Sequence, residues 1–237
     1  MDLLHLLSFD PSGWGRQLAT GAWLTIRLAL TTLPFGLLIG LALALAINGR
    51  QRWLSLGATS FTTVFRALPE LLTIFMIYYG AQIGIQKIAD AFLPGQVVEI
   101  DGFVAGVFAL GIVFASFASE TFVAGLRAIP RGQIEAAQSL GLGRYTIFVS
   151  VVLPQLWRLT LPGLGNLWLV LLKDTALVSV ISLNDLMRQT SLAVANTKEP
   201  LFFYAVTCMI YFAISLVSGH FVGLLEARSN RGFEAAR

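Results

Sequence analysis

The chain has 237 residues, of which 56% are hydrophobic and only 12% charged, whereas soluble domains carry about 25% charged residues. This composition excludes an ordinary soluble domain and predicts an integral membrane protein. The net charge is +3, but the sixteen basic residues form no dense block, which argues against a nucleic-acid partner. One cysteine and two distant histidines provide neither a disulfide pair nor a His/Cys metal site.

Five apolar runs are long enough to cross a bilayer, which takes about 20 residues of helix. The second run is predicted to be interrupted, because Pro69 lies between Arg66 and Glu70. We therefore expect an all-α integral membrane protein, with the whole chain, 1–237, forming one transmembrane domain. The predicted spans are 23–47, 54–80, 103–126, 161–183 and 201–225.

The connections between these spans differ in character. The stretch 81–102 is broken by charges and by Pro94, so we expect a loop or an interfacial segment. Basic residues gather on the cytoplasmic side of membrane proteins, and nine fall on one side of these spans against four on the other. The first set is Arg50, Arg52, Arg127, Arg131, Arg144, Arg158, Arg228, Arg231 and Arg237, and the second is Arg16, Lys87, Arg188 and Lys198. The amino terminus is predicted to be outside and the carboxyl terminus cytoplasmic.

The connection 127–158 carries a spaced pattern. Glu135-Ala136-Ala137 is followed after three residues by Gly141 and after nine more by Val151-Val152-Leu153-Pro154. Two short helices that meet at a glycine would form a stiff plug for a groove on a soluble partner. Glu135 would lie early in the first helix, where its charge is available to that partner or simply compensates the helix dipole.

This pattern resembles the EAA loop of ATP-binding-cassette (ABC) importer permeases. Only Val151 departs from it, standing where isoleucine is usual. The resemblance covers nearly the whole chain and extends to the branch that takes up polar amino acids such as histidine, arginine, lysine, ornithine and opines. It is carried by 66–72, 78–80, 128–133 and 172–181, with Ala67-Leu68 in place of the usual Gly-Thr.

The resemblance implies the type I ABC importer permease fold in the bacterial cytoplasmic (inner) membrane. It also implies three kinds of partner: a second permease chain, identical or paralogous, a dimer of cytoplasmic ATPase subunits docked on the EAA loops, and an extracytoplasmic substrate-binding protein. ATP-driven closure of the ATPase dimer would then move the spans. The coupling residues that it implies are Glu135, Ala136, Ala137, Gly141, Leu153 and Pro154.

Several charged residues are predicted to lie at membrane depth, where each costs about 2.5 to 3.5 kcal/mol on insertion scales. Such side chains should face protein or a water-filled path. Arg66 and Glu70 are four residues apart and could neutralise one another on one helix face. The candidate substrate path comprises Glu120, Asp174, Lys173, Thr175, Arg66 and Glu70.

Two interpretations of these charges remain open. We favour contact of Glu120 and Asp174 with a cationic substrate over interhelical pairing with Arg66 or Lys173, because three acids face two bases and leave one acid uncompensated. This excess favours basic amino acids. Thr175 could donate a hydrogen bond to a substrate carboxylate or to its own helix backbone.

The sequence contains no GxxxxGK[ST] loop, so we expect ATP and Mg²⁺ to be bound by the partner ATPase. We expect a transport subunit with no cofactor of its own and no enzymatic activity. An ion-coupled secondary transporter is the alternative, because it also carries charges at membrane depth, but it leaves the EAA spacing without a purpose. An intramembrane enzyme lacks a Ser/His/Asp or HExxH constellation here.

Overall fold

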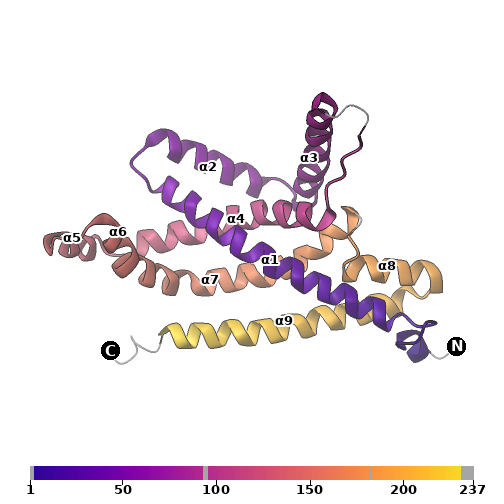
Figure 1. Ribbon diagram of the computed structural model, residues 1–237. Helices are drawn as coiled ribbons and strands as arrows, with labels where there is room; N and C mark the ends of the chain where they lie inside the picture. The colour runs from indigo at the N-terminus through magenta and orange to yellow at the C-terminus, as the bar shows by residue number, and fades with distance from the viewer. Residues whose placement is uncertain (1–2, 93–95, 182, 231–237) are drawn as a thin grey trace.

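The computed structural model describes residues 3–92, 96–181 and 183–230, and this part of the chain contains helices and no strand (Figure 1). Arg231, Arg237, Pro94 and Ser182, on which parts of the sequence interpretation rest, lie outside the described residues. The helices are η1 (Leu3–Leu7), α1 (Gly15–Ile47), α2 (Arg52–Ala67), α3 (Glu70–Phe92), α4 (Gly102–Ala128), α5 (Arg131–Ser139), α6 (Arg144–Ile147), η2 (Phe148–Val152), α7 (Leu153–Asp174), η3 (Thr175–Ile181), α8 (Leu186–Thr197) and α9 (Pro200–Asn230).

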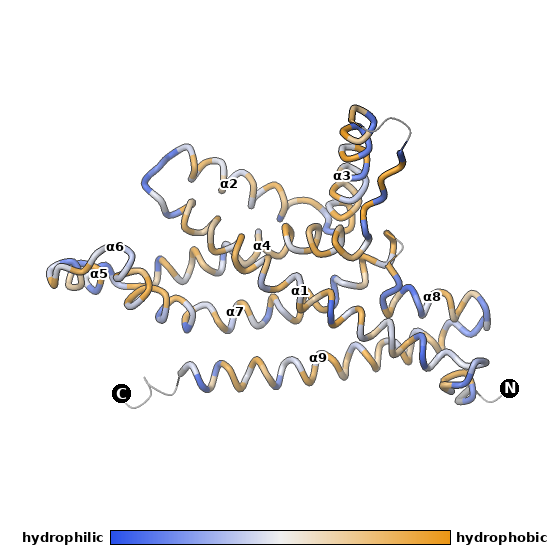
Figure 2. Tube along the Cα trace, viewed as in Figure 1, coloured by the Kyte–Doolittle hydropathy of each residue, from blue (hydrophilic) through white to orange (hydrophobic). Residues whose placement is uncertain are grey.

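Five helical segments of the described chain are long and apolar enough to cross a membrane. Figure 2 shows hydrophobic residues along the long helices and hydrophilic residues at their connections, including the α1–α2 turn and α5. The prediction of an all-helical protein with five spans is thus confirmed. The segments are Gly15–Ile47, Glu70–Phe92, Gly102–Ala128, Arg144–Ile181 and Pro200–Ser229.

The centre of the fold is the pair α1 and α4. Helix α4 also contacts α2, α3 and α7, while α7 contacts α9. The two central backbones approach closely, because a Cβ atom at Gly40 of α1 would lie 3.0 Å from the carbonyl oxygen of Ala115 in α4. Small residues permit such close packing where lipid removes the hydrophobic drive between helices.

The predicted second span, 54–80, is interrupted at Pro69 as expected, but its bounds are wrong. The chain breaks at Leu68, which has the extended ψ of 145° that a following proline favours, so α2 and α3 are separate helices. The segment with the length and hydropathy of a span is α3, which continues to Phe92 through much of the predicted loop 81–102.

Two glutamines of this polar stretch tie α3 to the segment that follows it. Gln82 and Gln86 lie on one face of α3 and bind the backbone of the returning segment 96–100. The Gln82 side-chain amide donates to the Val98 carbonyl at 2.6 Å, and its oxygen accepts from the Ile100 N–H at 3.0 Å. The polar residues therefore satisfy backbone groups of a segment that has no helix of its own.

Two other boundaries also differ from the sequence interpretation. Helix α1 begins at Gly15 rather than at 23, and α7 begins at Leu153 rather than at 161. In Figure 1, α5, α6 and the carboxyl-terminal end of α9 lie at one end of the molecule, with the amino terminus and α8 at the other. The connection 131–147 is therefore remote from α8.

Candidate functional site

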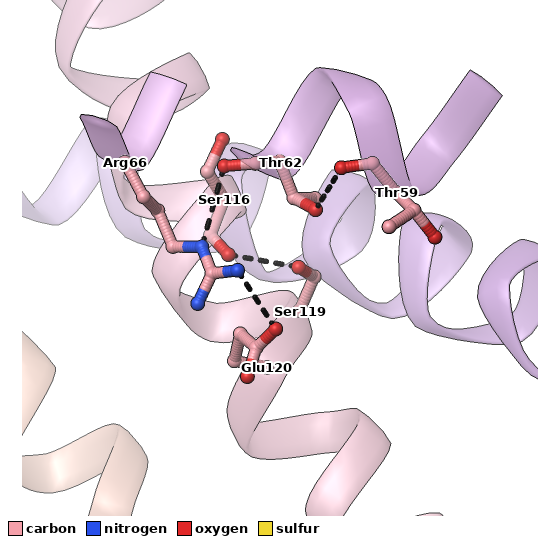
Figure 3. Close-up of polar contacts among 6 residues, drawn as sticks. All are labelled: Thr59, Thr62, Arg66, Ser116, Ser119 and Glu120. Atoms are coloured by element: carbon pink, nitrogen blue, oxygen red, sulfur yellow. Dashed lines mark hydrogen bonds and ion pairs between the residues drawn. The ribbon is translucent and has the colours of Figure 1, made fainter. Parts of the chain in front are cut away.

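Arg66 and Glu120 form an ion pair between α2 and α4 (Figure 3). The Arg66 Nη2 atom lies 2.9 Å from Glu120 Oε1, and the two side chains are 30% and 53% exposed. The Arg66 Nε–H also donates to the Thr62 carbonyl at 3.3 Å, in the last turn of α2, where a cation suits the helix dipole. Glu120 therefore pairs with Arg66 on another helix, which is the alternative to contact with substrate.

The hydroxyl groups beside this ion pair bond to their own helices. Ser119 donates to the Ser116 carbonyl at 2.8 Å, and Thr62 donates to the Thr59 carbonyl at 3.1 Å (Figure 3). Ser116 donates in turn to the Ile112 carbonyl at 3.0 Å. These hydroxyl groups therefore donate to backbone carbonyls and not to the Glu120 carboxylate.

Glu70 and Asp174 form a second charged group, between α3 and α7. Both side chains line the same cavity of about 180 Å³. The other described residues that line it are apolar side chains of α3, α4 and α7. Two carboxylates in an apolar cavity repel strongly because the local dielectric constant is low. The arrangement is suited to a cation or a shared proton.

The remaining predicted residues, Lys173 and Thr175, are neighbours of Asp174 in the sequence but do not line the cavity. Lys173 is exposed, and Thr175 is fully buried. The Thr175 hydroxyl donates to the Leu172 carbonyl at 2.6 Å, which is the backbone alternative for this residue. The six predicted path residues are therefore divided between one ion pair, one acidic pair and two flanking positions.

Helices α5 and α6, with the turn between them, form a hairpin over residues 131–147. Gly141 has φ of +76°, its N–H donates to the Gln138 carbonyl, and the Leu142 N–H donates to the Ala137 carbonyl. This pair of bonds is a Schellman motif, in which glycine takes the left-handed position at the lowest cost. The prediction of two short helices meeting at a glycine is confirmed.

The predicted coupling residues of the hairpin and of the start of α7 differ in their exposure. Glu135 and Ala136 are exposed, whereas Ala137 is buried in the core cluster with Ile147. Leu153 and Pro154 begin α7, and Pro154 is exposed. The glutamate is therefore free to meet a partner, while the second alanine holds the hairpin to the spans.

Two residues of the hairpin were missed by reasoning from the sequence. Leu140 and Tyr145 are each 80% exposed, on either side of the Gly141 turn. A patch of exposed apolar side chains marks a surface for a partner. An apolar residue directly before a left-handed glycine was the available signal.

The described residues contain no group of three or more His, Cys, Asp or Glu side chains that could hold a metal ion. The acidic pair suits a cationic ligand, and the hairpin suits a macromolecular partner.

Comparison with known proteins places the chain in a family. Residues 13–231 match the family described as binding-protein-dependent transport system inner membrane component. The chain is 39% identical to the arginine ABC transporter permease protein ArtQ of Escherichia coli K12, over 90% of this chain and 95% of that protein. It is 35% identical to the octopine transport system permease protein OccQ of Rhizobium meliloti, over 98% of each.

Solved structures agree with this assignment. A crystal structure of an amino acid ABC transporter with histidines matches with a TM-score of 0.76 and 32% identity, over 91% of this chain and 95% of that one. The five-span arrangement is that of type I ABC importer permeases and not of secondary transporters. ABC importers work with a separate ATPase, which hydrolyses ATP, and with a substrate-binding protein. The chain therefore belongs to the binding-protein-dependent transport system inner membrane components, as a multi-pass permease subunit of an ABC importer.

Proposed function

We propose that this permease imports basic amino acids and that Glu70 and Asp174 receive the cationic group of the substrate. The observation that carries the proposal is the acidic pair itself, which lines a cavity of about 180 Å³ with no basic side chain among its described lining residues. An ammonium or guanidinium group placed between the two carboxylates would relieve their repulsion and form charge-assisted hydrogen bonds. A neutral side chain would leave that repulsion in place.

The neighbouring charges complete the proposed path. The Arg66–Glu120 pair bridges α2 and α4, and α4 also contacts α3 and α7, which carry the acidic pair. Glu120 could exchange the guanidinium of Arg66 for that of a passing substrate, because its side chain is 53% exposed. Lys173 and Thr175 flank Asp174 and would act on its position and charge. The similarity to an arginine permease and to the histidine/lysine/arginine/ornithine permease HisQ of Escherichia coli K12, at 36% identity, supports a basic substrate.

The hairpin 131–147 is the proposed docking surface for the ATPase, which would bind ATP and Mg²⁺. Glu135, Ala136, Gly141, Leu140 and Tyr145 would meet the ATPase, since all five are exposed. Ala137, Leu153 and Pro154 would connect the docked hairpin to the spans. Closure of the ATPase dimer would then pull the hairpin and change which side of the membrane the acidic pair faces.

Two further features of the assembly belong to this proposal. The path would lie between this chain and a second permease chain, identical or paralogous. The amino terminus would be outside and the carboxyl terminus cytoplasmic, because the side with the hairpin carries the larger share of basic residues.

Substrate competition in proteoliposomes tests the choice of substrate. The complex is reconstituted with its ATPase and binding protein, and uptake of labelled arginine is measured against excess unlabelled arginine, lysine or glutamine. We expect lysine and arginine to compete and glutamine not to compete. Glu70→Gln and Asp174→Asn should each lower arginine uptake at least tenfold, while Glu99→Gln, an exposed acid outside the cavity, should leave it within twofold. Full arginine uptake in both cavity variants would overturn the proposal.

A further inference from the structure

One turn of π-helix separates the hairpin 131–147 from α7. It covers Phe148–Val152 (η2), and the Leu153 N–H donates to the Phe148 carbonyl, five residues back. An α-helix bonds four residues back, so this turn holds one extra residue. Single π-turns inside α-helices are rare and are found most often at functional sites.

The extra residue keeps both sides of the turn in contact with the same core. Ile147, Val152, Leu156 and Thr160 are all buried, at steps of five, four and four residues. At about 100° per residue, four residues of α-helix return to within about 40° of the starting face, whereas five overshoot it by about 140°. Without a wider turn, Ile147 and Val152 could not both face the core. The only five-residue step among these four coincides with the π-turn.

Pro154 is placed to hold this turn open. Its ring is exposed, so it adds little to the core and acts mainly through the backbone. In a regular α-helix the ring of Pro154 would clash with the carbonyl of Ser150, four residues back. The Gln155 side chain supports the wide turn as well, because its Nε2–H donates to the Val151 carbonyl at 2.7 Å.

We propose that Pro154 is a positioning residue that fixes the rotation of the hairpin about the axis of α7, and with it the direction in which Leu140 and Tyr145 point. This rests on the proposed function, in which the hairpin docks the ATPase. If the turn closed to α-helix, the hairpin would rotate by about 100° and shift by about 1.5 Å relative to α7. The spacing from Gly141 to Pro154 then has a physical reason, because the number of residues between them sets the direction in which the hairpin points.

A compensating pair of changes tests this role. Pro154→Ala removes the clash and allows the turn to close, which rotates the hairpin. Deletion of Ser150, an exposed residue within the turn, removes the extra residue, so in the Pro154→Ala background a regular α-helix again presents the hairpin in its original direction. Pro162→Ala is the matched control, because Pro162 is also exposed and lies in α7 itself, where the helix has no wide turn.

Two readouts are taken on the full complex. The first is the fold stimulation of ATP hydrolysis by arginine-loaded binding protein. We expect Pro154→Ala to lower it at least tenfold, and both the double variant and Pro162→Ala to remain within twofold of the parent protein. The second is the distance between spin labels at Gln138 and Trp53, in a Cys208→Ser background, which should shift in Pro154→Ala and return in the double variant.

The outcomes separate this inference from the proposed function. An unshifted distance or undiminished stimulation in Pro154→Ala would overturn the positioning role, and so would a double variant that fails to assemble or to recover. If Gly141→Asp abolishes transport while Pro154→Ala does not, docking at the hairpin stands and only the positioning role is lost. If the label distance shifts in Pro154→Ala and returns in the double variant, but stimulation of ATP hydrolysis is unchanged in both, the docking function of the hairpin is contradicted together with the positioning role.

Discussion

The guanidinium of Arg66 bridges to the carboxylate of Glu120 at 2.9 Å and joins two helices that are separated in the chain by the whole of α3. The pair lies where α2 ends, directly before the break at Leu68. It therefore holds the end of α2 against α4 at the point where the chain turns away into α3.

A double-mutant cycle on this pair should give a small coupling energy. Both side chains are partly exposed, and exposed ion pairs contribute at most about 1 kcal/mol. The variants Arg66→Met, Glu120→Gln and the double variant are compared by thermal unfolding of the purified chain. A coupling of several kcal/mol would show instead that the pair is shielded from water in the assembly.

Gly141 should be intolerant of a side chain for a backbone reason. Its φ of +76° is left-handed, and a Cβ there would meet nothing within 4 Å, so the expected cost of about 1 to 2 kcal/mol comes from the backbone alone. Gly141→Ala should weaken the hairpin through this backbone cost, and Gly141→Asp, which also adds a charge at the proposed ATPase contact, should abolish transport with membrane insertion intact. Gly143, with φ of −68° and equally open space, is the matched control, and Gly143→Ala should transport normally. Normal uptake in Gly141→Asp would count against a coupling role.

Leu140 and Tyr145 should dominate the affinity of the hairpin for the ATPase. A few residues, with Tyr among the commonest, carry most of the energy in protein interfaces, and truncating such a hot spot costs about 2 kcal/mol or more. Leu140→Ala and Tyr145→Ala should each weaken ATPase binding at least fivefold in titrations in detergent, whereas Thr146→Ala, also exposed on α6, should not. Equal affinity in all three variants would place the docking surface elsewhere.

The sequence predicts the structure of the hairpin but not the partners of the charged residues. The spacing from Glu135 to Pro154 predicts two helices and a glycine turn, because these are set by local backbone rules. The pairing of Arg66 with Glu120 rather than Glu70 depends on the break at Leu68, which turns α3 away from α2. Pro69 predicts the break itself, but the bounds 54–80 are wrong because composition does not show that α2 and α3 are separate helices or that α3 continues to Phe92.

Asp185 should make stability depend on pH. It caps α8 by accepting hydrogen bonds from the Met187 and Arg188 N–H groups, and burial raises its pKa to about 6. Because the pKa is higher in the folded chain than the value of about 4 in the unfolded one, ionisation disfavours folding. The thermal midpoint should therefore fall as pH rises from about 4 to about 6, and remain lower above that.

Two substitutions separate the charge of Asp185 from its capping role. Asparagine caps helices as well as aspartate does, so Asp185→Asn should abolish this fall and keep α8 docked on α1, where the Leu186 N–H donates to Thr25 Oγ1 at 3.2 Å. Asp185→Ala should abolish the fall and also lower stability by about 1 kcal/mol through loss of the cap. The measurement is the thermal midpoint from pH 4.5 to 7.5. An unchanged slope in Asp185→Asn would contradict the assignment.

The most direct test of the central claim is arginine uptake into proteoliposomes that contain this permease with its ATPase and binding protein. Internal ATP and sodium or proton gradients are supplied separately, so that each source of energy is tested alone. The account predicts uptake only with ATP and arginine-loaded binding protein, and loss of that uptake when Glu70 and Asp174 are both neutralised. Uptake driven by an ion gradient without nucleotide, or uptake undiminished in the neutralised variant, would contradict it.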